Sequence, residues 1–541
     1  MQEKNLNLKK QRMAAMPIID HVMRELGLRQ ILQSAVGHER HAAALEILVK
    51  NVLLTRSALY RVGEWAGSFD PNLACGGSFN DDILARALDK LYASDRASLQ
   101  TCCVLAAIKR FGIDTSTIHN DSTSVSFDGA YASQDTKAVR LKRGHSKDHR
   151  PDLKQLVYGL SVAADEAIPV HFKVYDGNVT DDTTHQETWL TLRGLLGKSD
   201  FLYVADCKLC TEENMTAIDR GQGRFITTVP KNRKETKTFA EAVLKSEVRW
   251  QPLWRKRSRR ESDGDDTFEL AEGLWQLREG YALHWYRSTE KMRRDAEDRD
   301  ERINETLEKL AALLDPGRRG PKTERALLKR AQQTIKKHGT TDWVIATVTS
   351  HELETFRKLT PGRSGRDSTY RKVVKKQAAL SWRLDEEAIA MSKATDGIFP
   401  LTTNTNLAPL DVLKHYKYQP RLEKRFSFLK SVTSIAPVFL KKNQRVEALM
   451  FVYFVAMLIA ALAERSIRRA MAGADIKVIH TLPEERPTET PTWEQITRLF
   501  EGHTRSELME GKRLVRVFND QLTASQRQVL RLLGVSETAF A

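Results

Sequence analysis

The sequence predicts an α/β protein, and three observations support this. Residues 1–113 place apolar side chains at steps of three and four, as amphipathic helices do. From Ile118 the pattern changes to short β-branched runs such as LVYGLSVAA and IPVHFKVY, separated by glycine, aspartate and asparagine. Helical periodicity returns after about residue 410. Strand and helix patterns in one chain indicate a sheet with helices packed on it.

Composition and charge restrict the class of function. The chain has 541 residues, of which 41% are hydrophobic and 29% charged, and it carries a net charge of +16. Several domains with sizeable cores fit into this length. An excess of positive charge favours a polyanionic partner, and the nucleic-acid phosphate backbone is the commonest one. An ordinary basic protein without such a partner is the alternative.

The sequence predicts no membrane segment. The longest uncharged stretch, Ala448 to Ala463, has 16 residues, whereas a membrane-spanning helix needs about 20. We therefore expect a buried helix there. The N-terminus has no apolar core of signal-peptide length. These features together predict a cytoplasmic bacterial protein, associated with the nucleoid if its partner is DNA.

Two of the five cysteines form a C-x2-C pair, Cys207 and Cys210, beside Asp206. A structural zinc site needs four ligands, and no second C-x2-C or histidine pair follows. Reduced cysteines are the expectation for a cytosolic protein. A redox pair remains the open alternative.

Pattern changes divide the chain into five segments. The stretch 231–409 interrupts the strand pattern and holds six of the nine tryptophans. It includes a predicted helical pair that breaks at Pro316-Gly317 and ends near Gly339. The predicted segments are a helical N-terminal domain (1–113), a first core part (114–230), an insertion (231–409), a second core part (410–474) and a helical C-terminal tail of unassigned role (475–541). The first of these is either a DNA-end binding module or a packing or dimerisation module.

Three carboxylates stand out as candidate ligands of metal ions. Asp121 lies inside a predicted strand, where aspartate is depleted. Asp206 closes the apolar run FLYVAD, whereas its competitor Asp200 precedes that run. Glu423 lies in a predicted helix. Mg²⁺ prefers such oxygen ligands and takes few of them from the protein. The alternatives are a helix N-cap for Asp206 and a surface ion pair for Glu423.

The sequence segments around these carboxylates resemble those of one known family. Seven segments carry the resemblance and follow in order between roughly Ile118 and Leu462: HNDSTSVSF, HSKDHRPDLKQLVYGL, IPVHFKVYDGNVTDDTTH, YVADCKLCTEENM, RFITTVP, DGIFPLTTN and EKRFSFLKS. The set resembles the DDE transposases of bacterial insertion sequences, in the branch with a Y-x2-R-x3-E-x6-K signature. The resemblance implies a ribonuclease-H-like core interrupted by a mainly β insertion domain.

The resemblance also implies an activity and its partners. Asp121, Asp206 and Glu423 would hold two Mg²⁺ or Mn²⁺ ions, which clamp the attacking and leaving oxygens of a phosphoryl transfer. The enzyme would cut the terminal inverted repeats of its element and join them to target DNA, as a homodimer in a synaptic complex. Two alternatives remain: a structure-selective nuclease on the same core, and a catalytically silent DNA-binding descendant.

The signature places its tyrosine on Tyr416, its glutamate on Glu423 and its lysine on Lys430. Tyr418 competes for the tyrosine position. Gln419 stands where the family has arginine, and Arg421 is the candidate replacement for that phosphate contact; we also expect arginine to be tolerated at position 419. The seven-residue step, about 700° on a helix, sets Glu423 and Lys430 on one face.

The stretch 137–154 concentrates basic residues between two predicted strands. Basic loops beside a metal site commonly hold a nucleic-acid backbone, and a merely solvated loop is the alternative. The candidate DNA-binding residues of this stretch are Arg140, Lys142, Arg143, Lys147 and Arg150.

Overall fold

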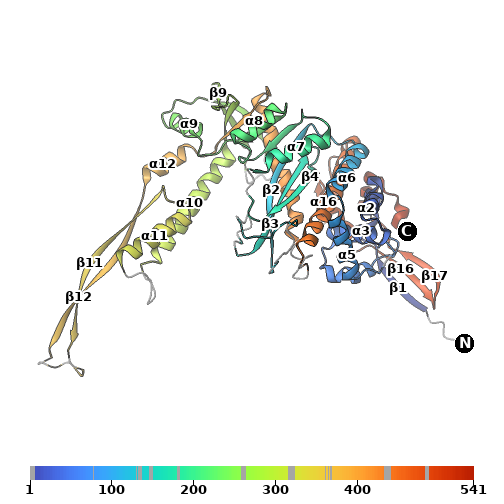
Figure 1. The fold of residues 1–541 in the computed structure, drawn as a ribbon, viewed down its shortest axis with the longest axis horizontal. Coiled ribbons are helices and arrows are strands. Elements are labelled where there is room, and N and C mark those ends of the chain that lie inside the picture. Colours follow the sequence, from blue (N-terminus) through green and yellow to red (C-terminus); the bar gives the residue numbers. More distant parts are fainter. Residues whose placement is uncertain are drawn as a thin grey trace. The chain divides into compact units, whose positions relative to one another are not determined.

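The computed structural model shows two compact units, each described by itself (Figure 1). Unit 1 comprises Met1–Thr227, Thr403–Asn406 and Val412–Ala541, and unit 2 comprises Thr228–Thr402 and Leu407–Asp411. The structure describes residues 6–76, 78–129, 131, 137–144, 150, 152–179, 183–257, 264–314, 323–359, 361–363, 365, 368–431, 440, 442–481 and 486–540.

Unit 1 contains a mixed sheet, which confirms the predicted α/β class. Its strands lie in the order β4-β3-β2-β5-β6. The pairs β2–β3 and β3–β4 are antiparallel, whereas β2–β5 and β5–β6 are parallel. Helices follow β4 and β5, as parallel connections require. The elements are β2 (Thr117–Phe127), β3 (Lys154–Ala163), β4 (Ile168–Asp176), α7 (His185–Leu196), β5 (Leu202–Ala205), α8 (Glu212–Arg220) and β6 (Arg224–Thr228).

A long apolar helix, α16 (Asn443–Gly473), lies in the core of unit 1. It is long and apolar enough to cross a membrane, yet 94% of its most apolar window is buried by the rest of the chain. The expectation of a buried helix is therefore confirmed. N-terminal helices pack on it, and Arg445 of α16 forms a two-bond ion pair with Asp89 at 2.7 Å. The N-terminal helices are α1 (Met16–Leu26), α2 (Leu28–Val36), α3 (Glu39–Leu54), α4 (Val62–Gly67), α5 (Asp81–Ala93) and α6 (Arg96–Phe111), and of these α1, α3 and α5 pack on α16.

The two chain ends meet in a small sheet that the sequence did not predict. Strand β1 (Leu6–Arg12) pairs antiparallel with β16 (Thr504–Glu510), which pairs with β17 (Arg513–Asn519). The segment LNLKKQR is exposed at five of its seven positions and lacks an apolar alternation, so only its partner makes it a strand. The predicted C-terminal helices are present as α17 (Trp493–Phe500) and α18 (Ala524–Leu533).

Unit 2 contains strands, an aromatic cluster and the predicted helical pair. Phe239 stacks on the buried Trp285 with ring centroids 3.9 Å apart, and Trp250 and Trp275 meet Phe239 edge-on. These tryptophans therefore serve packing. The elements are α9 (Lys234–Leu244), β7 (Trp250–Lys256), β8 (Asp266–Ala271), β9 (Trp275–Gln276), β10 (Ala282–Ser288), α10 (Thr289–Ala311), α11 (Glu324–Lys337), β11 (Val344–Lys358), β12 (Tyr370–Leu384), α12 (Glu386–Ala394) and β13 (Ile398–Thr403).

Candidate active site

Asp121 lies within strand β2, and Asp206 directly follows the neighbouring parallel strand β5. The register of the sheet pairs His119 of β2 with Val204 of β5. Asp121 follows His119 by two residues, and Asp206 follows Val204 by two residues. The two aspartates therefore occupy equivalent positions along the two chain segments. Both line one recess in the surface of unit 1. The carboxyl ends of parallel strands are where sites gather in α/β sheets.

Local hydrogen bonds orient both aspartates. The backbone N–H of Ser122 donates to Asp121 Oδ1 at 2.7 Å. The backbone N–H of Lys208 donates to Asp206 Oδ1 at 3.0 Å, and Thr227 Oγ1 donates to the Asp206 carbonyl at 2.6 Å. Asp206 thus closes a turn directly after β5. Its alternative role as a helix N-cap is excluded, because Thr211 caps α8.

Helix α14 (Gln419–Arg425), which carries Glu423, is bound to β2 through its first residue. Gln419 Oε1 lies 3.0 Å from Nδ1 of the buried His119. Gln419 Nε2 donates to the Asn120 carbonyl at 3.1 Å. Gln419 therefore acts as a neutral link between the helix and the strand of Asp121. Pro420 lies in the first helical turn, as its missing N–H predicts.

Tyr416, at the end of α13 (Pro409–Tyr416), lies within the electrostatic reach of all three carboxylates. Burial first, and then the negative charges of Asp206, Glu423 and Asp121, raise the pKa of the Tyr416 phenol to about 12. Tyr418 is occupied elsewhere: its ring lies 4.9 Å from that of His119, and its hydroxyl accepts the Ala167 N–H at 2.8 Å. The geometry favours Tyr416 over Tyr418 beside the carboxylates.

The three carboxylates do not converge on one point as they stand. Among the residues that the structure describes, no three aspartate, glutamate, histidine or cysteine side chains lie close enough to hold a metal ion. Asp121 and Asp206 are half-buried, whereas Glu423 is exposed. The two aspartates are therefore positioned by the sheet, while the glutamate is positioned only by its helix.

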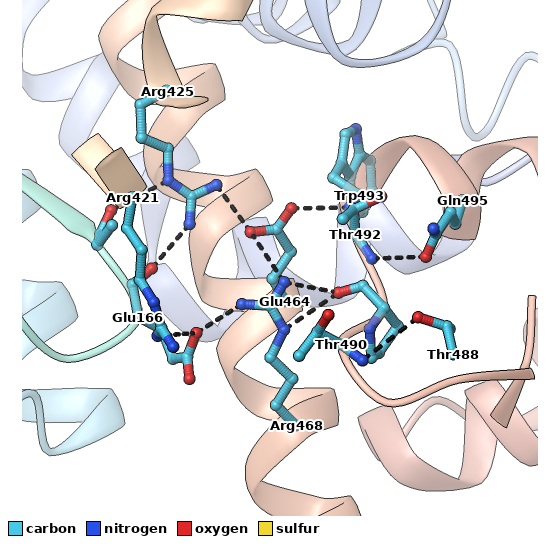
Figure 2. Close-up of polar contacts among 12 residues, drawn as sticks. Glu166, Arg421, Arg425, Glu464, Arg468, Thr488, Thr490, Thr492, Trp493 and Gln495 are labelled. Carbon is cyan, nitrogen blue, oxygen red and sulfur yellow. Dashed lines mark hydrogen bonds and ion pairs between the residues drawn. The ribbon is translucent and has the colours of Figure 1, made fainter. Parts of the chain in front are cut away.

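The opposite face of α14 is anchored by a buried arginine (Figure 2). Arg425 Nη1 pairs with Glu464 Oε2 of α16 at 2.8 Å, and both side chains are less than a tenth exposed. Arg425 also donates to the carbonyls of Glu166 at 2.8 Å and Ala167 at 3.1 Å. Glu464 Oε1 accepts the Trp493 N–H at 2.8 Å. This network fixes the helix, so that Glu423 faces away from the core.

The α-helix assumed to place Glu423 and Lys430 on one face does not continue to Lys430, so their common face stays a prediction. Helix α14 ends at Arg425, and Phe426–Ser431 form a 3₁₀ helix. Because a 3₁₀ helix turns by about 120° per residue, a step of 100° per residue does not apply across this change. Phe428 and Leu429 of this 3₁₀ helix are buried. The Lys430 side chain lies outside what the structure describes.

Arg421, the proposed replacement for the family's arginine, is half-exposed and lies over the Tyr418 ring at 4.9 Å. Its Nη1 is 3.4 Å from Glu166 Oε2. Arg468 Nη1 binds the same oxygen at 2.5 Å. Arg421 therefore has only a loose ion pair, from which a phosphate could draw it.

The predicted basic stretch lies between β2 and β3, and acidic neighbours offset part of its charge. Arg140 Nε is 2.8 Å and Lys142 Nζ 3.4 Å from Asp176 Oδ2. Arg150 pairs with Asp152 at 2.8 Å. The side chains of Arg140 and Arg150 are more than half exposed, so their ion pairs contribute little and leave both cations accessible.

Arg143 and Lys147 are the other two candidate DNA-binding residues of this stretch. Arg143 Nε donates to the Asp152 carbonyl at 3.2 Å, and its side chain is exposed. Lys147 lies outside the described residues.

Sequence reasoning missed several residues that shape this site. His185 Nδ1 is 3.1 Å from the Tyr203 hydroxyl, and its Nε2 is 4.0 Å from Asp206 Oδ1. His119 and Gln419 join β2 to α14, as described above. The motifs HND and DDTTH display both histidines, but a lone histidine next to an apolar run carries no distinguishing pattern. Cys207 and Cys210 are free thiols, as expected.

Comparisons with known proteins show a distant likeness to solved structures. No protein-family model matches the chain, and no curated protein matches it. Among solved structures, the chain is similar to the piggyBac transposase synaptic complex with hairpin DNA, at 10% sequence identity and a TM-score of 0.28. That alignment covers 51% of this chain and 59% of the piggyBac chain, less than two thirds of it.

Proposed function

We propose that this protein is a DNA transposase of the DDE type, which cuts the ends of an insertion sequence and joins them to target DNA. One observation carries the proposal: Asp121 of β2 and Asp206, directly after the adjacent parallel strand β5, line the same recess. The helix of Glu423 is linked to the first of these strands by Gln419. The strand order in unit 1, an antiparallel meander followed by two parallel strands, agrees with a ribonuclease-H-like core.

The carboxylates would hold Mg²⁺ or Mn²⁺, which activates a water or a 3′-hydroxyl for in-line displacement at phosphorus. The donor set fits these ions because it offers hard, charged oxygens in a half-exposed recess. Asp121 and Asp206 are preorganised by backbone N–H groups. Glu423 would complete the set by a rotation of its exposed side chain, since α14 itself is anchored.

The remaining side chains would hold DNA rather than react. The Tyr416 phenol stays protonated at neutral pH, because burial and three carboxylates raise its pKa to about 12. It can therefore donate a hydrogen bond to a phosphate oxygen close to the carboxylates. Arg421, Lys430 and the 137–154 stretch would supply cations along the DNA backbone, as a homodimer brings two element ends together.

The test compares Asp121→Asn, Asp206→Asn and Glu423→Gln with the unaltered protein. Each variant should lose nicking and strand transfer on DNA that carries the element's inverted repeats, while binding in a gel shift stays within about twofold. Neutral amides lose most of the charge that attracts the ions but leave the basic surfaces intact. Asp200→Asn is the matched control, because Asp200 precedes β5 and lies outside the recess.

The outcomes separate the transposase from its rivals. Cleavage without joining would favour a structure-selective nuclease. End binding without any cleavage by the unaltered protein would favour a catalytically silent descendant. Near-normal nicking by any one of the three variants would remove that residue from the proposed triad.

A further inference from the structure

Strands β11 and β12 form a two-stranded antiparallel ribbon in unit 2 that extends beyond the helices on which its base packs. Fifteen successive pairs run from Val344–Leu384 at the base to Lys358–Tyr370 near the tip. The base packs on helices α10 and α11, where Val344 and Leu380 join a core with Leu310 and Ile335. Figure 1 shows the ribbon continuing well beyond α11.

The distal part of the ribbon is exposed on both faces. Described side chains on Ser350–Lys358 and Tyr370–Lys376 are exposed, apart from the half-buried Lys358 and Val373. At about 3.4 Å per residue, the eight steps from Ser350 to Lys358 extend roughly 27 Å. An isolated two-stranded ribbon is at best marginally stable in water. Stability of the unit therefore does not account for this extension.

Charge is concentrated on the distal ribbon. Residues 349–377 contain eight lysines and arginines against three acidic residues. That net charge of +5 is about a third of the excess of the whole chain, in 29 of its 541 residues. Arg357 and Arg371 stand directly opposite each other in the register. Like charges in this position destabilise a ribbon, and a polyanion would offset the repulsion.

Exposed aromatic side chains accompany the cations. Phe356 is 65% and Tyr370 48% exposed. Lysines on edge strands also prevent unwanted strand pairing. Exposed aromatic rings do not serve that purpose. Cations interleaved with exposed apolar side chains on a narrow ribbon suit a groove lined by phosphates.

We propose that the distal β11–β12 ribbon binds duplex DNA as an arm, with its cations on the phosphates that border a groove. The inference rests on the proposed function, since it assigns a further DNA contact to the same protein. The major groove of B-DNA is wide enough to admit a two-stranded β-ribbon. The contact is expected to serve any sequence, because phosphate contacts carry no base information.

The experiment replaces four cations of the arm in the full-length chain: R357Q, R371Q, K375Q and K376Q. Lys372 is kept, because it pairs with Glu354 at 2.5 Å, and Lys358 is kept, because it donates to two carbonyls of the tip. Substitution leaves the apolar base on α11 intact. The matched control replaces four exposed cations of α10 and α11, namely K309Q, K329Q, R330Q and K336Q.

Binding to a random-sequence duplex is measured at several salt concentrations, with thermal unfolding as the folding check. The arm variant should bind at least tenfold more weakly at about 100 mM salt. The slope of log K against log salt should fall by about 2 to 4, since each lost phosphate contact removes about 0.9. The control variant should keep the slope of the unaltered protein.

Each outcome bears on one claim. Failure of the unaltered protein to bind or nick DNA would overturn the proposed function itself. Normal nicking and an unchanged salt slope in the arm variant would overturn only the arm. Equal losses in the arm and control variants would also overturn it, because general charge would then suffice. A loss of dimer with an unchanged slope would make the ribbon a contact between copies of this chain.

Discussion

The imidazole of His119 and the amide of Gln419 form a buried neutral pair, with Nδ1 and Oε1 3.0 Å apart. Gln419 Nε2 faces the Asn120 carbonyl, which only accepts, so Oε1 must face the histidine. His119 therefore carries its proton on Nδ1. The pair joins the strand of Asp121 to the helix of Glu423. This buried contact is the structural reason for a neutral residue at position 419.

Gln419→Arg should destabilise unit 1 by about 3 kcal/mol, because it buries a cation against an N–H donor without a counter-ion. This reverses the expectation from sequence, in which arginine at this position restores the family's signature. Gln419→Met keeps the volume and should cost about 1–3 kcal/mol through the two lost hydrogen bonds. Urea unfolding measures both. An arginine variant as stable as the unaltered protein would contradict the neutral-pair account.

Acidification should weaken the fold through His119. Burial lowers the pKa of His119 to about 4; the bond to Gln419 opposes this shift, and the charge of His415 adds to it. The unfolded chain titrates near 6.5 and so binds more protons between pH 6.5 and 4, and stability falls as pH decreases through that range. Between pH 7.5 and 5 the loss should be about 2 kcal/mol.

The measurement is the unfolding free energy of the unaltered protein and of His119→Gln at both pH values, in chelator so that no ion perturbs Asp121. The variant should be less stable at pH 7.5 but show a smaller loss on acidification. A background slope will remain, because burial also lowers the pKa of His171 to about 4. Equal slopes in the two proteins would show that His119 is not held neutral.

Arg425→Met should destabilise the protein by about 3–5 kcal/mol, because Glu464 then keeps a buried charge without its main partner. Arg421→Met is the matched control four residues earlier. That arginine is half-exposed and its pair with Glu166 is loose, so the cost should stay below about 1 kcal/mol. Chemical denaturation distinguishes the two. Similar costs would mean that the network of Figure 2 does not anchor the helix.

Cleavage should require Mg²⁺ or Mn²⁺ and be inhibited by Ca²⁺. Ca²⁺ forms longer bonds in a loose geometry, so it binds carboxylates without aligning an in-line attack. Nicking assays with each ion alone, and with Ca²⁺ added to Mg²⁺, measure this. Strong strand transfer in Ca²⁺ or in excess chelator would exclude the proposed use of Asp121, Asp206 and Glu423.

Periodicity predicted the elements that bury an apolar face. The α/β class, the strand of Asp121, the strand end at Asp206 and the buried helix 448–463 all follow from local patterns. What failed depends on contacts between distant residues. Nothing in EKRFSFLK shows that its helix tightens after Arg425. Nothing in the HND motif shows that His119 lies against Gln419, 300 positions later.

The pairing of β1 with β16 has a consequence for synthesis of the protein. Arg12 pairs with Thr504, 492 positions later in the chain. A ribosome that adds about 5–20 residues per second releases the second strand roughly 25–100 s after the first. During that time the basic segment LNLKKQR has no partner strand, and its charges help to keep it soluble. The closing sheet can therefore form only after Thr504–Glu510 have been synthesised, long after the N-terminal helices that pack on α16 have left the ribosome.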